Sequence, residues 1–461
     1  MVPNATTLGK IGRDPAYPLN GTYRQTANID GSGLSHSIGN KTHAFTGEYN
    51  GLYRAITGLD CCLVDNLEGE IGNLHFTGAN IISTSRPAGV VACEMGGNGT
   101  IRHISVHKSK VITTGNDADA GIGVGVLLGG TLDNIFALHS KVTTTGEGAD
   151  AGIGSGSIGN GSAISRIGAF NSQVTTTGNN SNAAIGAGYV NGTVVGTSAY
   201  QNKVTTSGAG ANAGIGAGAM GDGTRLADTF AKDCKVFTSG AGANAGIGAG
   251  RIGRSARVAN TSAQCFSSVI TTGDEANAGI GAGFMDPWAR IVGTRSRNSK
   301  VVTSGVRAHA GIGAGMIRGN ASVIDTLAVN SRATASGNNA SADIGAGRIE
   351  PGGVVTNTTQ VNTGVLTCEP AKPAYTPASV VTASNTAMSV SDFPGATMTL
   401  PTSAAPLANT LSNGAIAGIT LGAAVAFALA GVVGGFIYRH CYCRPYPADD
   451  GAPQNENRQS A

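Results

Sequence analysis

The stretch "ANAGIGAG" occurs three times, at Ala211–Gly218, Ala243–Gly250 and Ala276–Gly283. Aligning the chain on the isoleucine of this stretch reveals eight repeats of 30 to 33 residues, centred on Ile122, Ile153, Ile185, Ile215, Ile247, Ile280, Ile312 and Ile344. A fixed period of this length indicates a solenoid or a propeller, in which each repeat buries its apolar face by stacking on its neighbours. The isoleucine is therefore predicted to be the core residue of each repeat.

The glycine content excludes helical repeats. Of 461 residues, 72 are Gly and only 12% are charged, and each Gly inside a helix costs about 1 kcal/mol relative to Ala. The second repeat offers three strands, "KVTTTG" at Lys141–Gly146, "AGIGSGSI" at Ala151–Ile158 and "AISRIGAFNS" at Ala163–Ser172. Three strands per repeat predict one coil of a parallel β-helix. A propeller is the alternative, although a blade needs about 40 residues and four strands.

Stacked coils place equivalent residues in columns. Three positions before each core isoleucine, the column reads Asp119, Asp150, Asn182, Asn212, Asn244, Asn277, His309 and Ser341. Amide side chains stacked in this way predict a hydrogen-bonded ladder from coil to coil, of which His309 would be a member. Calcium bound by Asp119 and Asp150 is the alternative, but two carboxylates fall short of the oxygen cage that calcium takes. We assign no metal site, no cofactor and no catalytic residue.

Two further columns carry hydroxyl and basic side chains. The first is Thr113, Thr144, Thr176, Thr206, Thr238, Thr271 and Thr303. A flat array of Thr two positions apart would bind ice or a crystalline polysaccharide, but the partner column includes Ile112, Phe237, Ile270 and Val302. The basic column is Lys110, Lys141, Lys203, Lys235, Lys300 and Arg332, with Gln173 and Ser268 between them. These cations would either engage an anionic glycan or remain solvated and discourage aggregation.

The N-terminal region supplies a family resemblance. The segments "NID", "FTGEYNG" and "IGNLHF" between Thr22 and Ile81, together with the later "AGIGAG" runs, resemble bacterial surface proteins built from GLUG repeats. The resemblance covers about residues 20 to 365. It implies a right-handed parallel β-helix on a secreted or surface-attached, adhesin-like protein, with no catalytic set to transfer.

The C-terminal region changes in composition. Residues 369–414 are rich in Pro, Ser, Thr and Ala, which is typical of a linker. Ala415–Tyr438 is uncharged and long enough to cross a hydrocarbon core of about 30 Å as a transmembrane helix. Two GxxxG spacings in this span would allow a dimer, and they are formed by Gly418, Gly422, Gly431 and Gly435.

The flanks of the span predict its orientation. Arg439, His440 and Arg444 follow it, so residues 439–461 are expected to be cytoplasmic and the repeats outside. Residues 1–21 contain no apolar signal-peptide region, and we expect them to be a leader or a flexible start. Two alternatives follow. Either the true start of the protein lies upstream of residue 1, or the protein is tail-anchored with its repeats in the cytoplasm. Cys61, Cys62 and Cys93 can supply one disulfide, and the sequence does not decide which two of them pair. Cys234 and Cys265 are predicted to lie too far apart to form a disulfide.

These observations predict an all-β protein. Its regions are N-terminal β-helix coils over 22–100, an eight-repeat solenoid over 101–368, a linker over 369–414, a span over 415–438 and a tail over 439–461. We expect a non-catalytic, membrane-anchored solenoid that displays a repetitive surface to a glycan or protein ligand. The alternatives are a polysaccharide-processing β-helix enzyme and an ice- or crystal-binding Thr array. A net charge of +3 gives no basis for nucleic-acid binding.

Overall fold

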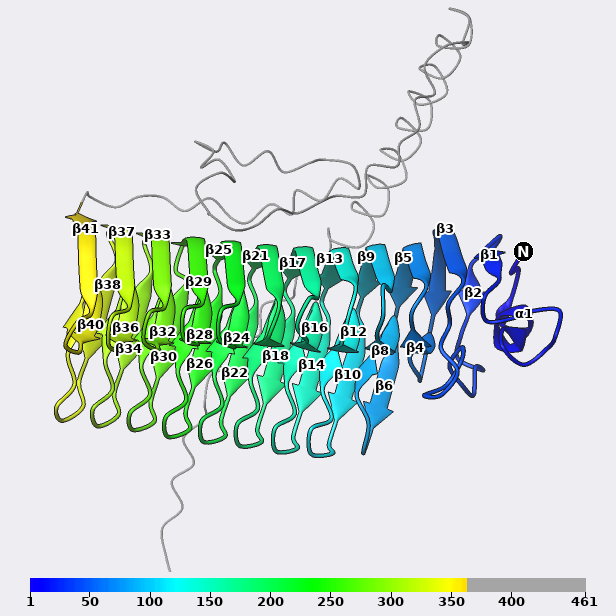
Figure 1. Ribbon diagram of the computed structural model, residues 1–461, viewed down its shortest axis with the longest axis horizontal. Coiled ribbons are helices and arrows are strands. Elements are labelled where there is room, and N and C mark those ends of the chain that lie inside the picture. The colour runs from blue at the N-terminus through cyan, green and yellow to red at the C-terminus, as the bar shows by residue number, and fades with distance from the viewer. Residues whose placement is uncertain (363–461) are drawn as a thin grey trace, which may run out of the picture. The chain divides into compact units, whose positions relative to one another are not determined.

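The computed structural model describes residues 1–362, which form a parallel β-solenoid (Figure 1). Its strands pair only with equivalent strands of the neighbouring coils, in four sheets of 13, 9, 9 and 10 strands. In the coil that follows Thr131, the chain runs through β13 (Thr131–Leu138), β14 (Lys141–Thr144), β15 (Ala151–Gly152) and β16 (Ser155–Ile158). We call the four sheets that these strands represent sheets 1 to 4.

Sheet 1 begins with the short strands β1 (Thr22–Arg24) and β2 (Ile29–Asp30). Its long strands are β3 (Glu48–Thr57), β5 (Glu70–Thr77), β9 (Thr100–His107), β13, β17 (Ala163–Phe170), β21 (Thr193–Tyr200), β25 (Arg225–Lys232), β29 (Arg257–Gln264), β33 (Arg290–Arg297), β37 (Ser322–Val329) and β41 (Val354–Val361). Sheet 2 contains β6 (Asn80–Ser83), β10 (Lys110–Thr113), β14, β18 (Gln173–Thr176), β22 (Lys203–Thr206), β26 (Lys235–Thr238), β30 (Ser268–Thr271), β34 (Lys300–Thr303) and β38 (Arg332–Ala335).

Sheet 3 contains the two-residue strands β7 (Ala88–Gly89), β11 (Ala120–Gly121), β15, β19 (Ala183–Ala184), β23 (Ala213–Gly214), β27 (Ala245–Gly246), β31 (Ala278–Gly279), β35 (Ala310–Gly311) and β39 (Ala342–Asp343). Sheet 4 contains β4 (Val64–Leu67), β8 (Ala92–Met95), β12 (Val124–Leu127), β16, β20 (Ala187–Val190), β24 (Ala217–Met220), β28 (Ala249–Ile252), β32 (Ala282–Met285), β36 (Ala314–Ile317) and β40 (Ala346–Ile349).

Each coil from β5 to β40 thus has four strands and not the three expected from the sequence. The run "AGIGSGSI" does not form one strand, because the chain bends at Ile153 and Gly154 and divides the run into β15 and β16. A continuous apolar run does not reveal such a corner, since small residues fit a strand and a bend equally well. The isoleucine at the corner points inward. Seven of the eight core isoleucines are fully buried, and Ile344 in the last coil is partly buried.

The long strands bend at one position in each coil. Asn134 in β13 has a φ of 55°, in the left-handed region, and the equivalent Asn260 and Asp325 have φ values of 54° and 59°. Asn, Asp and Gly tolerate this conformation better than other residues. Neighbouring side chains in this column hydrogen-bond, as Asn260 Nδ2 does to Asp228 Oδ1 at 3.0 Å. The sequence analysis did not identify this second Asx column.

The first 21 residues form a cap with a helix and buried apolar side chains, and not the flexible start that was one of the two expectations from the sequence. Helix α1 (Ala5–Lys10) begins at Asn4, whose side chain accepts a hydrogen bond from the Thr7 amide at 2.9 Å. Val2, Leu8 and Ile11 are buried at the end of the solenoid. The apolar residues of this segment therefore cover the first coil.

One disulfide joins neighbouring coils near this cap. Cys62 and Cys93 are bonded with a Cα–Cα distance of 5.6 Å, and Cys61 is free. Cys234 and Cys265 are not bonded to one another, as the sequence predicted.

Residues 363–461 lie outside the described part of the chain. The predicted linker, the span at Ala415–Tyr438 with Gly418, Gly422, Gly431 and Gly435, and the C-terminal tail all fall there. Within residues 1–362, no helix has the length and apolarity needed to cross a bilayer.

Candidate functional site

The Asx column forms a continuous hydrogen-bonded ladder on the outside of the core. Oδ1 of Asn182 accepts from both the backbone amide and Nδ2 of Asn212, at 3.1 and 3.0 Å. The same pair of bonds joins Asn212 to Asn244 and Asn244 to Asn277. The ladder lies directly against sheet 4 at the last glycine of each "AGIGAG" run. A Cβ on Gly218 would lie 2.8 Å from the Asn182 Cβ, so no larger residue fits there.

The central amides of the ladder have no capacity left for a ligand. Asn212 Nδ2 donates to Asn182 Oδ1 and to the Gly210 carbonyl at 3.0 Å each, while its Oδ1 accepts two bonds from Asn244. An amide has two donor hydrogens and two acceptor sites, and all four are used. These asparagines hold the loops in place, and any recognition must come from other side chains.

The ladder begins with two carboxyl groups. The Asp150 amide donates to Asp119 Oδ1 at 2.7 Å, and Ser157 Oγ donates to Asp119 Oδ2. Burial raises the pKa of Asp119 to about 6. Burial, and then the charge of Asp119, raise the pKa of Asp150 well above its ordinary value. Within residues 1–362, no three His, Cys, Asp or Glu side chains are grouped to hold a metal ion.

The ladder ends at His309. Its backbone amide donates to Asn277 Oδ1 at 3.0 Å, and its Nδ1 lies 2.7 Å from Ser341 Oγ. Burial, and then the charge of Arg348, lower the pKa of His309. The residue thus takes the backbone position of an asparagine, but its ring replaces the amide that would continue the ladder.

Two adjoining cavities follow the ladder and share Arg251. The first holds about 500 Å³ and lies over Asn182 and Asn212, with Tyr189 and Ala219 on its sheet 4 side. The second holds about 390 Å³ and lies over Asn244, Asn277 and His309. In both, outward side chains of sheet 4 face the loop between sheets 2 and 3, and residues of the turn that follows sheet 4 complete the lining. We call the two cavities together the groove.

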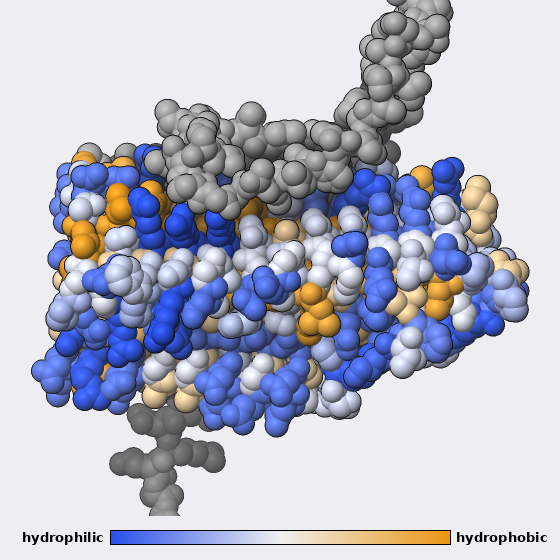
Figure 2. Space-filling model, in the orientation of Figure 1, coloured by the Kyte–Doolittle hydropathy of each residue, from blue (hydrophilic) through white to orange (hydrophobic). Residues whose placement is uncertain are grey.

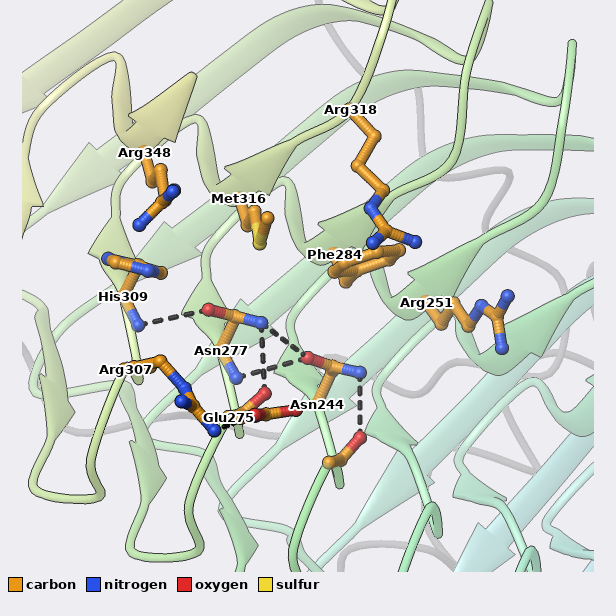
Figure 3. A pocket seen from close by; sticks show the side chains of 11 residues that line it. Asn244, Arg251, Glu275, Asn277, Phe284, Arg307, His309, Met316, Arg318 and Arg348 are labelled. Carbon is orange, nitrogen blue, oxygen red and sulfur yellow. Dashed lines mark hydrogen bonds and ion pairs between the residues drawn. The ribbon is translucent and has the colours of Figure 1, made fainter. Parts of the chain in front are cut away.

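Arginines dominate the second cavity, as Figure 3 shows. Along the sheet 4 wall lie Arg251, Phe284, Met316 and Arg348, which are in register on four successive strands. Arg318 follows β36 and lies over the Phe284 ring at 5.4 Å from its centroid, and Arg307 projects from the loop. This cluster could not be predicted from the sequence, because its column mixes basic, aromatic and aliphatic residues and has no common chemistry.

The Thr column faces inward, and no flat hydroxyl array forms on sheet 2. Thr206 is fully buried, and its Oγ1 donates to the Ala211 carbonyl at 2.6 Å. All seven threonines of this column make the equivalent bond to the carbonyl five residues later, which closes the loop under the ladder. The outward positions of each strand are the basic column and the mixed column that contains Phe237 and Ile270.

The basic column is stacked in register along sheet 2, from Lys110 to Arg332. Its lysines are exposed, and no ion pair to an acidic residue joins them within the described part of the chain. The face of the solenoid in Figure 2 is mostly hydrophilic, with apolar residues in separate small areas.

Comparisons with known proteins assign no family to this chain. No protein-family model and no curated protein matches the sequence. One solved structure, titled a "putative immunoglobulin A1 protease" from Bacteroides ovatus, aligns with 16% identity and a TM-score of 0.34, over 67% of this chain and 76% of that chain. A similarity at this level carries no argument about activity, so the fold assignment rests on the observed strand pairing.

Proposed function

We propose that this protein is a non-catalytic, single-pass membrane-anchored β-solenoid that presents its groove to an extended ligand for adhesion or partner contact. The observation that carries the proposal is the groove itself, which runs over several coils on a hydrogen-bonded ladder whose central amides are saturated. Such a site is preorganised, so a ligand binds without ordering the protein first. The proposal includes three further statements. The protein is related to GLUG-repeat surface proteins, its coils are right-handed, and Ala415–Tyr438 spans the membrane.

The disulfide supports an outward-facing solenoid. Cys62 and Cys93 lie on neighbouring coils at a distance suited to bonding. Disulfides persist in oxidising compartments and are rare in the cytosol. The bond therefore favours the surface arrangement over the tail-anchored alternative.

The carboxylates of the groove favour binding over bond cleavage. Cleavage of a glycosidic bond by acid–base chemistry needs two carboxyl groups that flank the bond. The acidic residues that line the two cavities are Asp222, Glu275 and Asp286. Glu275 pairs with Arg307, Asp286 pairs with Arg251 at 2.8 Å, and Asp222 accepts from the Arg254 amide at 2.8 Å.

Antibody labelling of cells that express the full chain tests the topology. An antibody against the repeats is expected to label intact cells, and an antibody against residues 439–461 is expected to label them only after permeabilisation. Labelling of the repeats only after permeabilisation would show that the solenoid is cytoplasmic.

Blocking the groove tests the binding role. Ala219 lies on the sheet 4 wall between Tyr189 and Arg251, so Ala219→Trp fills the groove at a position that accepts an aromatic residue one coil earlier. Ser198→Trp is the matched control on the outer face of sheet 1, where Phe230 occupies the next coil. Adhesion of cells displaying the protein is expected to fall with Ala219→Trp and to persist with Ser198→Trp. Equal adhesion by both variants would place the contact elsewhere.

A further inference from the structure

The second cavity has more cationic than anionic side chains. Four arginines and one carboxylate, Glu275, line it. Arg307 pairs with Glu275, Arg251 with Asp286, and Arg318 lies 3.5 Å from Glu350. Arg348 is exposed and has no ion pair among the described residues. The guanidinium group of Arg348 is therefore free to bind an anion, and its planar donors suit a carboxylate.

An apolar ledge separates the two ends of this arginine row. Phe284 and Met316 lie between Arg251 and Arg348 in the sheet 4 register. Arg251 and Arg318 contact the Phe284 ring at 5.8 and 5.4 Å from its centroid, which holds the ring in place. Three coil intervals of about 4.8 Å separate Arg251 from Arg348, so a ligand that reaches both must extend for about 14 Å.

Between Arg251 and Met316, the sheet 4 wall offers a ligand its side chains and not its backbone. The strands of sheet 4 from β28 to β36 are paired on both edges, so their backbone is not open for an added peptide strand, whereas β40 is the last strand of the sheet among the described residues and pairs only with β36. The ladder amides of Asn244 are saturated. Sugar rings present an apolar face and, in uronic acids, a carboxylate on the same ring, which matches a ledge flanked by guanidinium groups.

We propose that the cavity between Arg251 and Arg348 binds a carboxylate-bearing polysaccharide, a chain of uronic-acid residues, with Arg348 as the main ligand of one carboxylate and Phe284 and Met316 beneath the sugar rings. This inference rests on the proposed binding role of the groove and specifies its ligand class. The nearby ring of His309 lines the same end of the cavity, as Figure 3 shows.

Binding of full-length protein in detergent to oligomers of polygalacturonate tests the inference, with the fully methyl-esterified oligomers as the neutral control. The free acid is expected to bind and the ester is not, and binding should weaken between 50 and 500 mM NaCl because salt screens the charges. Arg348→Gln should weaken binding about tenfold or more, since it removes a charge-assisted hydrogen bond. Arg332→Gln, an exposed arginine of sheet 2 in the same coil, should leave it unchanged.

Three outcomes of the polygalacturonate measurements would overturn the inference. These are equal binding of acid and ester, loss of binding with Arg332→Gln and not with Arg348→Gln, and absence of polyuronate binding by the unmodified protein. If the unmodified protein does not bind polyuronate but Ala219→Trp still reduces adhesion, the groove binds another class of ligand and the proposed function survives. If adhesion is also insensitive to Ala219→Trp, both proposals fail. A single-stranded DNA oligomer that binds as well as polygalacturonate would show a general polyanion site and would also contradict the uronate assignment.

Discussion

The backbone amide of Asp150 donates to Oδ1 of Asp119 at 2.7 Å, which places two buried carboxyl groups one above the other in a ladder otherwise built mainly from amides. Burial raises the pKa of both groups in the folded protein, that of Asp119 to about 6. The unfolded value is about 3.9. The folded state therefore binds protons more tightly. Stability from Asp119 is lost as the pH rises from about 4 through 6, and Asp150 acts in the same direction.

Asp150→Asn is expected to stabilise the protein at pH 8 and to reduce this pH dependence. The new amide can donate to Asp119 Oδ1 and to the Gly148 carbonyl, as Asn212 does to the equivalent groups of its neighbours. We expect a gain of about 1–3 kcal/mol in the free energy of unfolding at pH 8 and little change at pH 4.5. Urea unfolding of the full-length chain at the two pH values measures it.

The reverse change is the matched control. Asn244→Asp introduces a carboxyl group at a buried ladder position and should destabilise the protein at pH 8 more than at pH 4.5. If Asp150→Asn were instead destabilising at pH 8, the two carboxyl groups would have to be ionised and stabilised by contacts other than those described.

Thr206→Val is expected to lower the free energy of unfolding by about 1–3 kcal/mol. The substitution removes the bond to the Ala211 carbonyl and leaves a buried acceptor unpaired, with almost no change in side-chain volume. Thr205→Val is the control, because the Thr205 hydroxyl is buried and has no hydrogen-bond partner among the described residues. That variant should be neutral or slightly stabilising. Equal losses from both would mean that side-chain shape, and not the hydrogen bond, decides the effect.

Gly208→Ala is expected to destabilise the solenoid strongly. A Cβ there would lie 1.9 Å from the carbonyl oxygen of Gly178 in the preceding coil, well inside any real contact. The coils would have to separate locally, at a cost of about 1–3 kcal/mol or more. Gly96→Ala is the control, since nothing lies within 4 Å of its Cβ position. Hydrogen exchange of the β18 and β22 amides should increase in the first variant, and an unchanged exchange rate would contradict the close packing.

The Cys62→Ser and Cys93→Ser double variant is expected to lose about 2–4 kcal/mol of stability, because the bond restricts the unfolded chain. The thermal unfolding of the double variant should be insensitive to reductant. Cys61→Ser retains the bond and should respond to reductant as the unmodified protein does. A double variant as stable as the unmodified protein would show that the N-terminal coils do not depend on the crosslink.

Much of the solenoid could be predicted from the sequence because stacking converts spacing along the chain into adjacency in space. The period of 30 to 33 residues indicates parallel coils, and the structure pairs Val142 with Val174 and Val174 with Val204 at that spacing. The bend at Asn134 was missed although a similar column signal exists. Asn, Asp and Gly recur there, but His103 and Arg166 interrupt the pattern.

The groove could not be predicted by comparing columns. Tyr189, Arg251, Phe284 and Arg348 share a column but no chemistry, so only their common exposure beside the ladder loop makes them one site. The sequence by itself determined the repeat, the inward isoleucines and the coil-to-coil pairing, because each follows from a fixed period and local preferences. The tertiary structure alone decided where each coil turns, because small residues allow both strand and corner. It also decided which side chains face one another across the groove, since that depends on how the loop between sheets 2 and 3 folds against sheet 4.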